Sequence, residues 1–345
     1  MFSFSQNNIM NNDYNIWFLL IIIGQVSSIK ASNEGIPYNQ PSFCQNASWD
    51  LNATTFTDVN TTGLYPVTIF INRNNTIYIP NQSNNRLLVW SETNLALTNN
   101  ISINSSNLFD IFVTETDNIY VGVSTSLFGI NKLSLTSTSL HRIMFTCKEC
   151  QGIFIDISNN IYCSMRYGYQ VVKKSLDTTS NILTVVAGTG SSGSTSTTLN
   201  EPYGIFVDDN FDLYVADIAN NRIQLFHSGE LSATTVAGSG SPTATISLNR
   251  PTSVVLDADK YLFIVDCDNH RIVASNAYGF RCIVGCSGQG STTDKLKYPW
   301  SMAFDSDGNI YVADQNNHRI QKFLLLTGLC SKFPTNDIVI YNSSK

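Results

Sequence analysis

An internal repeat constrains this chain more than any other feature of its sequence. Three segments align without gaps at their centres: DLYVADIANNRIQLF (212–226), YLFIVDCDNHRIVAS (261–275) and NIYVADQNNHRIQKF (309–323). Each contains an Asp five residues before an Arg, and each follows a Pro and a short apolar stretch. A fixed period of roughly 20–50 residues is typical of solenoids, propellers and arrays.

Fainter copies of the same unit precede these three. The copy at 65–90 keeps the Pro, the aromatic and the Arg, whereas those at 108–123 and 150–164 keep only two β-type runs. One aromatic residue marks every copy: Tyr78, Tyr120, Tyr162, Tyr214, Phe263 and Tyr311. Their spacings of 42, 42, 52, 49 and 48 residues are also the spacings between the starts of the copies. The aromatic residues and the starts of the copies therefore indicate the same six units.

Each unit contains several β-type runs separated by turn residues. In the fourth copy these are GIFVD (204–208), LYVAD (213–217), RIQLF (222–226) and ATTVAG (233–238). No segment has convincing helical periodicity. Four antiparallel strands in about 45 residues are typical of a propeller blade. The sequence therefore predicts an all-β fold, a six-bladed β-propeller of four-stranded antiparallel blades.

The ending D-x-x-N-[NH]-R-I, written NHRI at 269–272 and 317–320, resembles the NHL repeat. The resemblance covers about residues 65–326 and implies a six-bladed β-propeller. Related propellers include peptidyl-hydroxyglycine amidating lyases, teneurin-type ectodomains and the C-terminal domains of ubiquitin ligases. The resemblance therefore implies a fold and leaves both an enzyme and a binding module open.

The start of the chain predicts export. The apolar run from Ile16 to Gly24 would span ~14 Å as a helix, too short for a bilayer core of about 30 Å. Small residues follow it, so we expect a signal peptide cleaved after Ser28, with an uncleaved membrane anchor as the alternative. The predicted divisions are a signal peptide (1–28), an N-terminal segment with a ring-closing strand (29–64), the propeller (65–330) and a C-terminal tail (331–345).

The last blade needs a fourth strand from outside its own unit. DIVIY (337–341) is one source, and SWDLNATTF (48–56) is the other. The N-terminal source would fasten both ends of the chain into one blade and bring Cys44 near Cys330. A disulfide between them is our hypothesis for how the ring is locked.

An even number of cysteines in an exported chain indicates disulfides. The eight candidates are Cys44, Cys147, Cys150, Cys163, Cys267, Cys282, Cys286 and Cys330. In the fifth unit, Cys267 with Cys286 is geometrically easier than Cys267 with Cys282. Cys147, Cys150 and Cys163 form a second group of three, so each group leaves one cysteine over.

Sequons for N-glycosylation gather near the N-terminal end, although their number is what chance predicts. The candidates are Asn46, Asn52, Asn60, Asn74, Asn81, Asn100 and Asn104. We expect this end to carry glycans if the chain is exported.

Charged residues recur with the repeat. The pairs Asp217–Arg222, Asp266–Arg271 and Asp314–Arg319 resemble ion pairs across a hairpin, and exposed pairs of this kind contribute only about 0–1 kcal/mol each. Four carboxylates end first strands: Asp156, Asp208, Asp257 and Asp305. A ring of them could hold a cation, but capping of the turn that follows is the favoured interpretation.

Other motifs are weak signals of chemistry. Gly188–Gly193 matches G-x-G-x-x-G, but no helix pattern follows, so we expect a linker between blades. Cys147-x-x-Cys150 lacks the second half of a zinc site. His270 and His318 share one repeat position in a turn, which makes them poor partners for a metal in the central tunnel.

Composition excludes some partners. With 26 acidic and 20 basic residues the net charge is −6, which argues against nucleic acid and anionic membranes, so membrane contact is expected only if the N-terminal segment is retained. The innermost positions are small and neutral except for one carboxylate: Thr68, Asp110, Gly152, Gly204, Ser253 and Ser301. We therefore expect a secreted, non-catalytic binding module without cofactor or metal, whose protein or glycan ligand docks on one face. The alternative is a propeller enzyme with a metal at the tunnel, similar to the amidating lyases or to lactonases.

Overall fold

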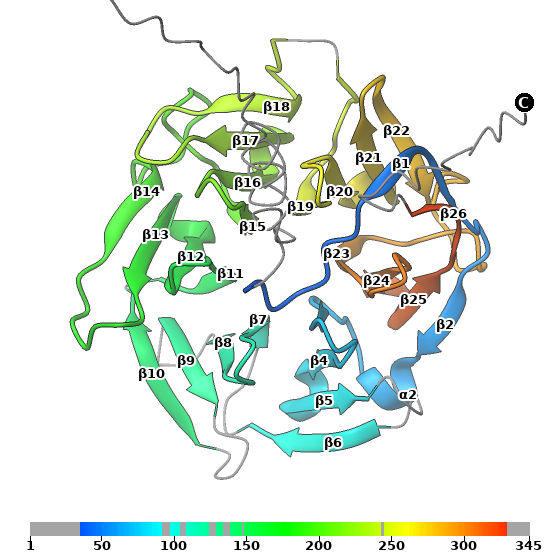
Figure 1. The fold of residues 1–345 in the computed structure, drawn as a ribbon, viewed down its shortest axis with the longest axis horizontal. Coiled ribbons are helices and arrows are strands. Elements are labelled where there is room, and N and C mark those ends of the chain that lie inside the picture. The colour runs from blue at the N-terminus through cyan, green and yellow to red at the C-terminus, as the bar shows by residue number, and fades with distance from the viewer. Residues whose placement is uncertain are drawn as a thin grey trace, which may run out of the picture. The chain divides into compact units, whose positions relative to one another are not determined.

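The computed structural model describes residues 35–329 except 92–96, 104–107, 124–128, 134–138, 147 and 243–244. In this part of the chain, six four-stranded antiparallel sheets follow one another around an axis (Figure 1). The predicted all-β, six-bladed propeller is confirmed. No helix among the described residues is long and apolar enough to cross a membrane.

Each blade runs from an inner strand beside the axis to an outer strand at the rim. The first three blades contain β3 (Phe70–Ile71), β4 (Ile77–Asn81), β5 (Arg86–Trp90), β6 (Leu97–Ser102); β7 (Leu108–Val113), β8 (Ile119–Val123), β9 (Gly129–Leu133), β10 (Leu140–Phe145); and β11 (Cys150–Ile155), β12 (Asn160–Met165), β13 (Gln170–Ser175), β14 (Thr184–Gly188). The last three contain β15 (Pro202–Val207), β16 (Leu213–Asp217), β17 (Arg222–Phe226), β18 (Thr234–Gly238); β19 (Pro251–Leu256), β20 (Leu262–Asp266), β21 (Arg271–Asn276), β22 (Gly279–Val284); and β23 (Pro299–Phe304), β24 (Ile310–Asp314), β25 (Arg319–Phe323) with β2 (Thr54–Thr57).

The N-terminal segment completes the sixth blade. Strand β2 pairs antiparallel with β25, so the closing strand comes from the N-terminal source. A second pairing joins β1 (Phe43–Trp49) to β26 (Leu325–Leu329). Cys44 forms a disulfide, and its neighbour Phe43 pairs with Leu329. Cys330 and DIVIY lie outside the described residues, so the Cys44–Cys330 pairing stays a prediction.

Apolar residues from successive blades form a shared core. One continuous cluster extends from Phe70 in blade one to Val273 in blade five. Each sheet therefore buries both of its faces against its neighbours, which is why apolar residues recur on every strand. Large side chains such as Tyr162 and Phe226 are almost completely buried.

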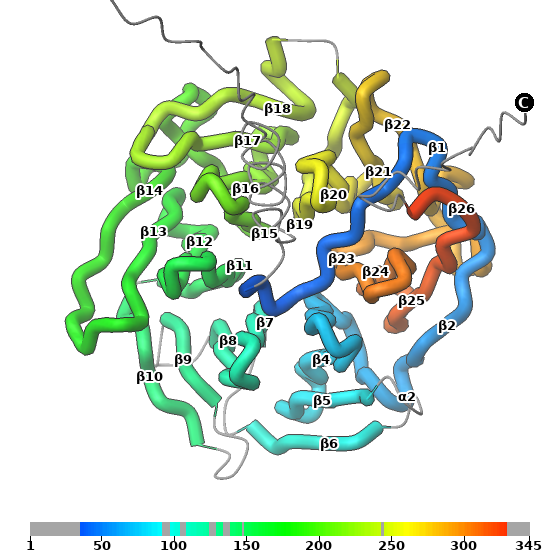
Figure 2. The backbone as a smooth tube through the Cα atoms, viewed as in Figure 1, coloured from blue at the N-terminus to red at the C-terminus, as the bar shows by residue number. Residues whose placement is uncertain are grey.

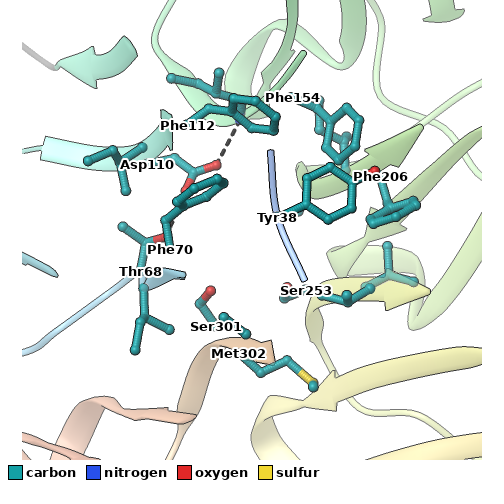
Figure 3. A pocket seen from close by; sticks show the side chains of 18 of the residues that line it. Tyr38, Thr68, Phe70, Asp110, Phe112, Phe154, Phe206, Ser253, Ser301 and Met302 are labelled. Carbon is teal, nitrogen blue, oxygen red and sulfur yellow. Dashed lines mark hydrogen bonds between the residues drawn. The ribbon is translucent and has the colours of Figure 1, made fainter. Parts of the chain in front are cut away.

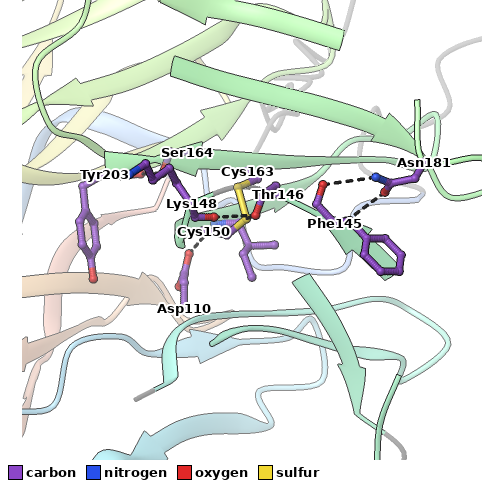
Figure 4. The surroundings of a disulfide bond; sticks show 10 residues. Asp110, Phe145, Thr146, Lys148, Cys150, Cys163, Ser164, Asn181 and Tyr203 are labelled. Carbon is purple, nitrogen blue, oxygen red and sulfur yellow. Dashed lines mark hydrogen bonds between the residues drawn. A yellow bond between two sulfur atoms is a disulfide. The ribbon is translucent and has the colours of Figure 1, made fainter. Parts of the chain in front are cut away.

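Two disulfides lie within the described residues. Cys150 and Cys163 join the inner two strands of blade three (Figure 4). Cys282 pairs with Cys286, and Cys267 is a buried free thiol, so the predicted preference for Cys267 with Cys286 is wrong. Gly285 has a left-handed φ of 73° that turns the chain after β22, and the Cα atoms of Cys282 and Cys286 lie 5.9 Å apart. Cys147 lies outside the described residues.

Candidate functional site

The aspartates of the repeated Asp–Arg pairs are fully buried and the arginines are 7–25% exposed, which corrects the interpretation of these pairs as exposed ion pairs. The side chains of Asp217, Asp266 and Asp314 have no exposed surface. Arg Nε lies 2.7–2.8 Å from the carboxylate in all three pairs. The aspartates are buried because the loop that leads into each blade folds over the pair.

Arg222 shows how that loop is held. Its guanidinium donates hydrogen bonds to the carbonyl oxygens of Ser194, Thr195 and Thr198 at 2.8–3.1 Å. The carboxylate of Asp217 accepts from the backbone N–H of Asn200, at the end of the same loop. Arg319 makes the same contacts in blade six, to the loop at 285–298. The repeat motif is therefore a clamp on the loops between blades.

The acidic residues that end the inner strands cap the turns that follow them. Asp156, Asp208, Asp257 and Asp305 each accept two backbone hydrogen bonds, from the residues two and four positions later. These contacts confirm the turn interpretation. Among the described residues, no cluster of three His, Cys, Asp or Glu side chains could hold a metal ion.

His270 and His318 occupy equivalent turns in blades five and six. Both have left-handed φ angles, of 58° and 55°. The Nδ1 atom of His270 accepts the backbone N–H of Tyr298, and that of His318 accepts the N–H of Tyr65, at 3.2 Å in both cases. The two histidines therefore link neighbouring blades.

The G-x-G-x-x-G motif begins at the last residue of β14 and continues into the connection to β15, so it joins two blades as predicted. Gly188 and Gly190 adopt left-handed φ angles of 78° and 83°. The N–H of Gly193 donates to the carbonyl of Leu199, closing the loop on itself. No helix follows the motif in the described residues, so it lacks the phosphate-binding geometry of the dinucleotide fingerprint.

The inner strands enclose a cavity of about 110 Å³ on the axis (Figure 3). Tyr38 stands in it at the end where the inner strands finish. Its ring packs edge to face against Phe112, Phe154 and Phe206, with centroids 5.5–6.2 Å apart. The segment that follows runs outward to β1, and the Gln40 amide donates to the carbonyl of Asp257 (Figure 2). The N-terminal segment thus contributes to the cavity as well as to closure.

The end of the cavity where the inner strands begin is polar and aromatic. Asp110, Gly204, Trp300 and Ser301 are partly exposed there. Tyr203 packs edge to face against Trp300, with ring centroids 5.3 Å apart. Sequence reasoning missed these two aromatics, although each directly follows the Pro that starts its unit.

Asp110 is the charged group of this wall. Its carboxylate accepts hydrogen bonds from the hydroxyl of Thr68 at 2.7 Å and from the N–H of Ile153 at 2.8 Å. It thereby connects blades one, two and three. Burial raises the pKa of Asp110 to about 6, against the lowering effect of these hydrogen bonds.

The small residues at the other innermost positions have a packing role. A Cβ atom at Gly152 would lie 2.2 Å from the carbonyl oxygen of Tyr203, and one at Gly204 would lie 2.6 Å from that of Thr252. Only glycine fits there, because the next inner strand approaches too closely. Ser253 and Ser301 line the cavity beside them.

The predicted glycosylation residues differ in accessibility. Five are exposed: Asn46, Asn52, Asn60, Asn74 and Asn100. Asn81 is buried, and its side-chain N–H donates to the carbonyl of Thr61. The folded chain has no room for a glycan at Asn81, so this candidate is withdrawn. Asn104 lies outside the described residues.

The geometry defines a six-bladed β-propeller with an axial cavity. Residues 296–323 match the family model of the NHL repeat, so the resemblance seen in the sequence is confirmed. The chain is a six-bladed β-propeller in which one segment matches the NHL repeat. No curated protein matches it.

Solved structures with the same fold have varied roles. An auxiliary nutrient binding protein from Bacteroides thetaiotaomicron VPI-5482 is 14% identical with a TM-score of 0.61, over 84% of this chain and 76% of that one. Virginiamycin B lyase from Staphylococcus aureus is 12% identical with a TM-score of 0.57, over 81% and 100%. A gluconolactonase from Xanthomonas campestris is 11% identical with a TM-score of 0.58, over 86% and 99%. At these identities the similarity shows the fold alone.

Proposed function

We propose that this propeller is an exported, non-catalytic binding module whose ligand enters the axial cavity at the end where the inner strands begin. The observation that carries the proposal is the wall of that end, where Trp300, Tyr203 and Asp110 line a cavity that is partly exposed. Concave sites with aromatic walls and a few polar groups are the usual form of ligand sites.

Two observations support export and binding over catalysis. Disulfides such as Cys150–Cys163 form and persist in oxidising compartments. The innermost ring offers a single carboxylate, Asp110, whereas a metal-dependent lyase or lactonase needs several converging ligands. A protein or glycan ligand that inserts one group into the cavity fits this wall.

The test compares two aromatic substitutions in the secreted protein. Trp300 lines the cavity, whereas Tyr278 is 85% exposed in the hairpin between β21 and β22. Labelled protein is screened on glycan and peptide arrays, and the bound ligand is titrated. We expect Trp300→Ala to weaken binding at least tenfold and Tyr278→Ala to leave it unchanged. Equal affinities of the two variants would contradict the proposal.

Two further measurements address the alternatives. Metal analysis of the secreted protein should find no stoichiometric calcium or zinc, and a full equivalent of either would favour the enzyme. N-terminal sequencing should begin at Ile29, whereas an intact N-terminus would indicate a membrane anchor.

A further inference from the structure

Asp110 is a carboxylate without a counter-charge. None of the ion pairs among the described residues includes it. Its donors are the hydroxyl of Thr68 and the backbone N–H groups of Ile153 and Ile111, and none of these carries a charge. Arg166 of blade three is paired with Glu201. The negative charge therefore faces the cavity uncompensated.

Aromatic side chains form part of the remaining wall, beside aliphatic and hydroxyl residues such as Ile153 and Ser301. Phe70 and Phe112 line it, and their ring centroids lie 5.2 Å apart. Tyr203 and Trp300 line the same cavity from blades four and six. Aromatic faces carry partial negative charge, so they attract organic cations, most strongly where water is excluded.

We propose that the cavity binds an organic ammonium group, with Asp110 as its counter-ion and the aromatic wall as its cage. This inference rests on the proposed function and adds the chemical class of the group that is bound. It also assigns a role to the charge at Asp110, which the hydrogen bonds to Thr68 and Ile153 do not require. A neutral amide could make both of those bonds, because Asn Oδ1 would accept from Ile153 and Asn Nδ2 would donate to Thr68.

A neutral sugar or peptide group would leave the charge of Asp110 buried. Transfer of an unpaired charge from water into a low-dielectric site is strongly unfavourable, and an incoming cation removes this penalty. The chemistry of the wall therefore favours a cationic ligand group over a neutral one of the same shape.

A comparison of choline with its neutral carbon isostere, 3,3-dimethylbutan-1-ol, tests the contribution of the ligand's charge, because the two ligands have the same shape. Calorimetric titration of the secreted protein at pH 7.5 should give at least tenfold tighter binding of choline. Asp110→Asn should remove that preference while the affinity for the neutral alcohol stays the same. Thr68→Val is the matched control, because it removes a hydrogen bond to Asp110 and keeps the charge, so it should still prefer choline.

The same titration at lower pH gives a second readout. Choline affinity should fall as the pH drops through about 6 and Asp110 becomes protonated, and it should be independent of pH in Asp110→Asn. Tyr203 lines the same cavity and stays neutral throughout, because burial raises its pKa.

Three outcomes would overturn the inference: equal affinities for choline and the alcohol, unchanged choline affinity in Asp110→Asn, or no binding of choline, tetramethylammonium or methylammonium. If one of these occurs while Trp300→Ala still abolishes capture of an array ligand, the cavity binds a neutral group and the proposed function stands. If Trp300→Ala has no effect either, the proposed function fails as well.

Discussion

Blades four to six differ from blades one to three in how the chain passes from one blade to the next. The last strand of one blade and the first strand of the next are separated by 13, 12 and 14 residues before blades four, five and six, but by only five and four residues before blades two and three. The extra residues account for unit spacings of 52, 49 and 48 in place of 42. An Asp–Arg clamp with a fully buried Asp accompanies each of these three long connections.

In the early blades, other contacts are found at the position that corresponds to the Asp of the Asp–Arg pair. In blade one, Asn81 occupies the position of the clamp Asp and donates to the carbonyl of Thr61, in the helix α2 (Val59–Thr62). In blade three, Met165 occupies it, and the disulfide Cys150–Cys163 joins the inner strands. We infer that the Asp–Arg signature of the NHL repeat occurs where a long loop between blades has to be held in place. The absence of this signature from the early units therefore does not mean that a blade is absent.

Removal of the clamp arginine should have the largest effect. Arg222→Met leaves Asp217 buried without its partner and frees three loop carbonyls, so we expect a loss of about 3–5 kcal/mol in the free energy of unfolding. Urea denaturation measures it. The matched control is Arg166→Met in blade three, whose partner Glu201 is 27% exposed, with an expected loss of about 1 kcal/mol. Equal losses would show that the clamp is no more than a surface pair.

The disulfides test whether blade three depends on its covalent link. Cys150 and Cys163 are 13 residues apart in sequence, and Cys282 and Cys286 are four apart. In the chain-entropy model, replacing the first pair by Ser costs about 3 kcal/mol and replacing the second about 2 kcal/mol. Denaturation of the two double variants, with Cys267 unchanged in both, gives the comparison. A larger loss for the shorter loop would show that native-state packing outweighs loop closure.

Sequence predicted the blades and the capped turns, because these follow from local patterns, and it offered the N-terminal segment as one of two sources of the closing strand. It placed the Asp–Arg pairs at the surface, since the burial of Asp217 depends on a loop whose path no local pattern specifies. It also did not foresee that Tyr38 would reach the cavity, because this contact joins the N-terminal segment to three distant blades. Asp110 was found as the single charge among the innermost positions.

Asp110 should reduce the stability of the early blades at neutral pH. Its pKa is about 6 in the folded state and 3.8 in the unfolded chain, so the folded state binds more protons between these values and stability falls as the pH rises through them. The difference corresponds to at most about 3 kcal/mol, and partial exposure lowers it, so Asp110→Asn should stabilise by about 1–2 kcal/mol at pH 7.5. At pH 3.5 the two proteins should unfold at the same urea concentration. Destabilisation by Asn at pH 7.5 would mean that the carboxylate is needed for structure.

The smallest expected effect on stability concerns one turn position of the late blades. This position is occupied by Asn221 in blade four and by His270 in blade five. Asn221 accepts the N–H of Arg250 with an amide oxygen at 2.8 Å, and His270 accepts that of Tyr298 with Nδ1. Protonation removes this acceptor from His270 and cannot remove it from Asn221. Burial lowers the pKa of His270 below 6.5, against the opposite influence of nearby acidic residues, Asp268 first among them.

Stability from the neutral His270 is therefore present above about pH 6.5 and is lost as the pH falls from there towards the lower folded-state pKa. His270→Asn should keep the link at both pH values, so the melting temperature of the wild type should fall more between pH 7.5 and pH 5.5 than that of the variant. The corresponding difference in the free energy of unfolding is expected to be less than about 1 kcal/mol, which is the contribution of one hydrogen bond. Asn221→His supplies the reverse substitution and should introduce the same pH dependence into blade four. Parallel melting curves for wild type and both variants would show that the link between blades does not depend on the side chain at this turn.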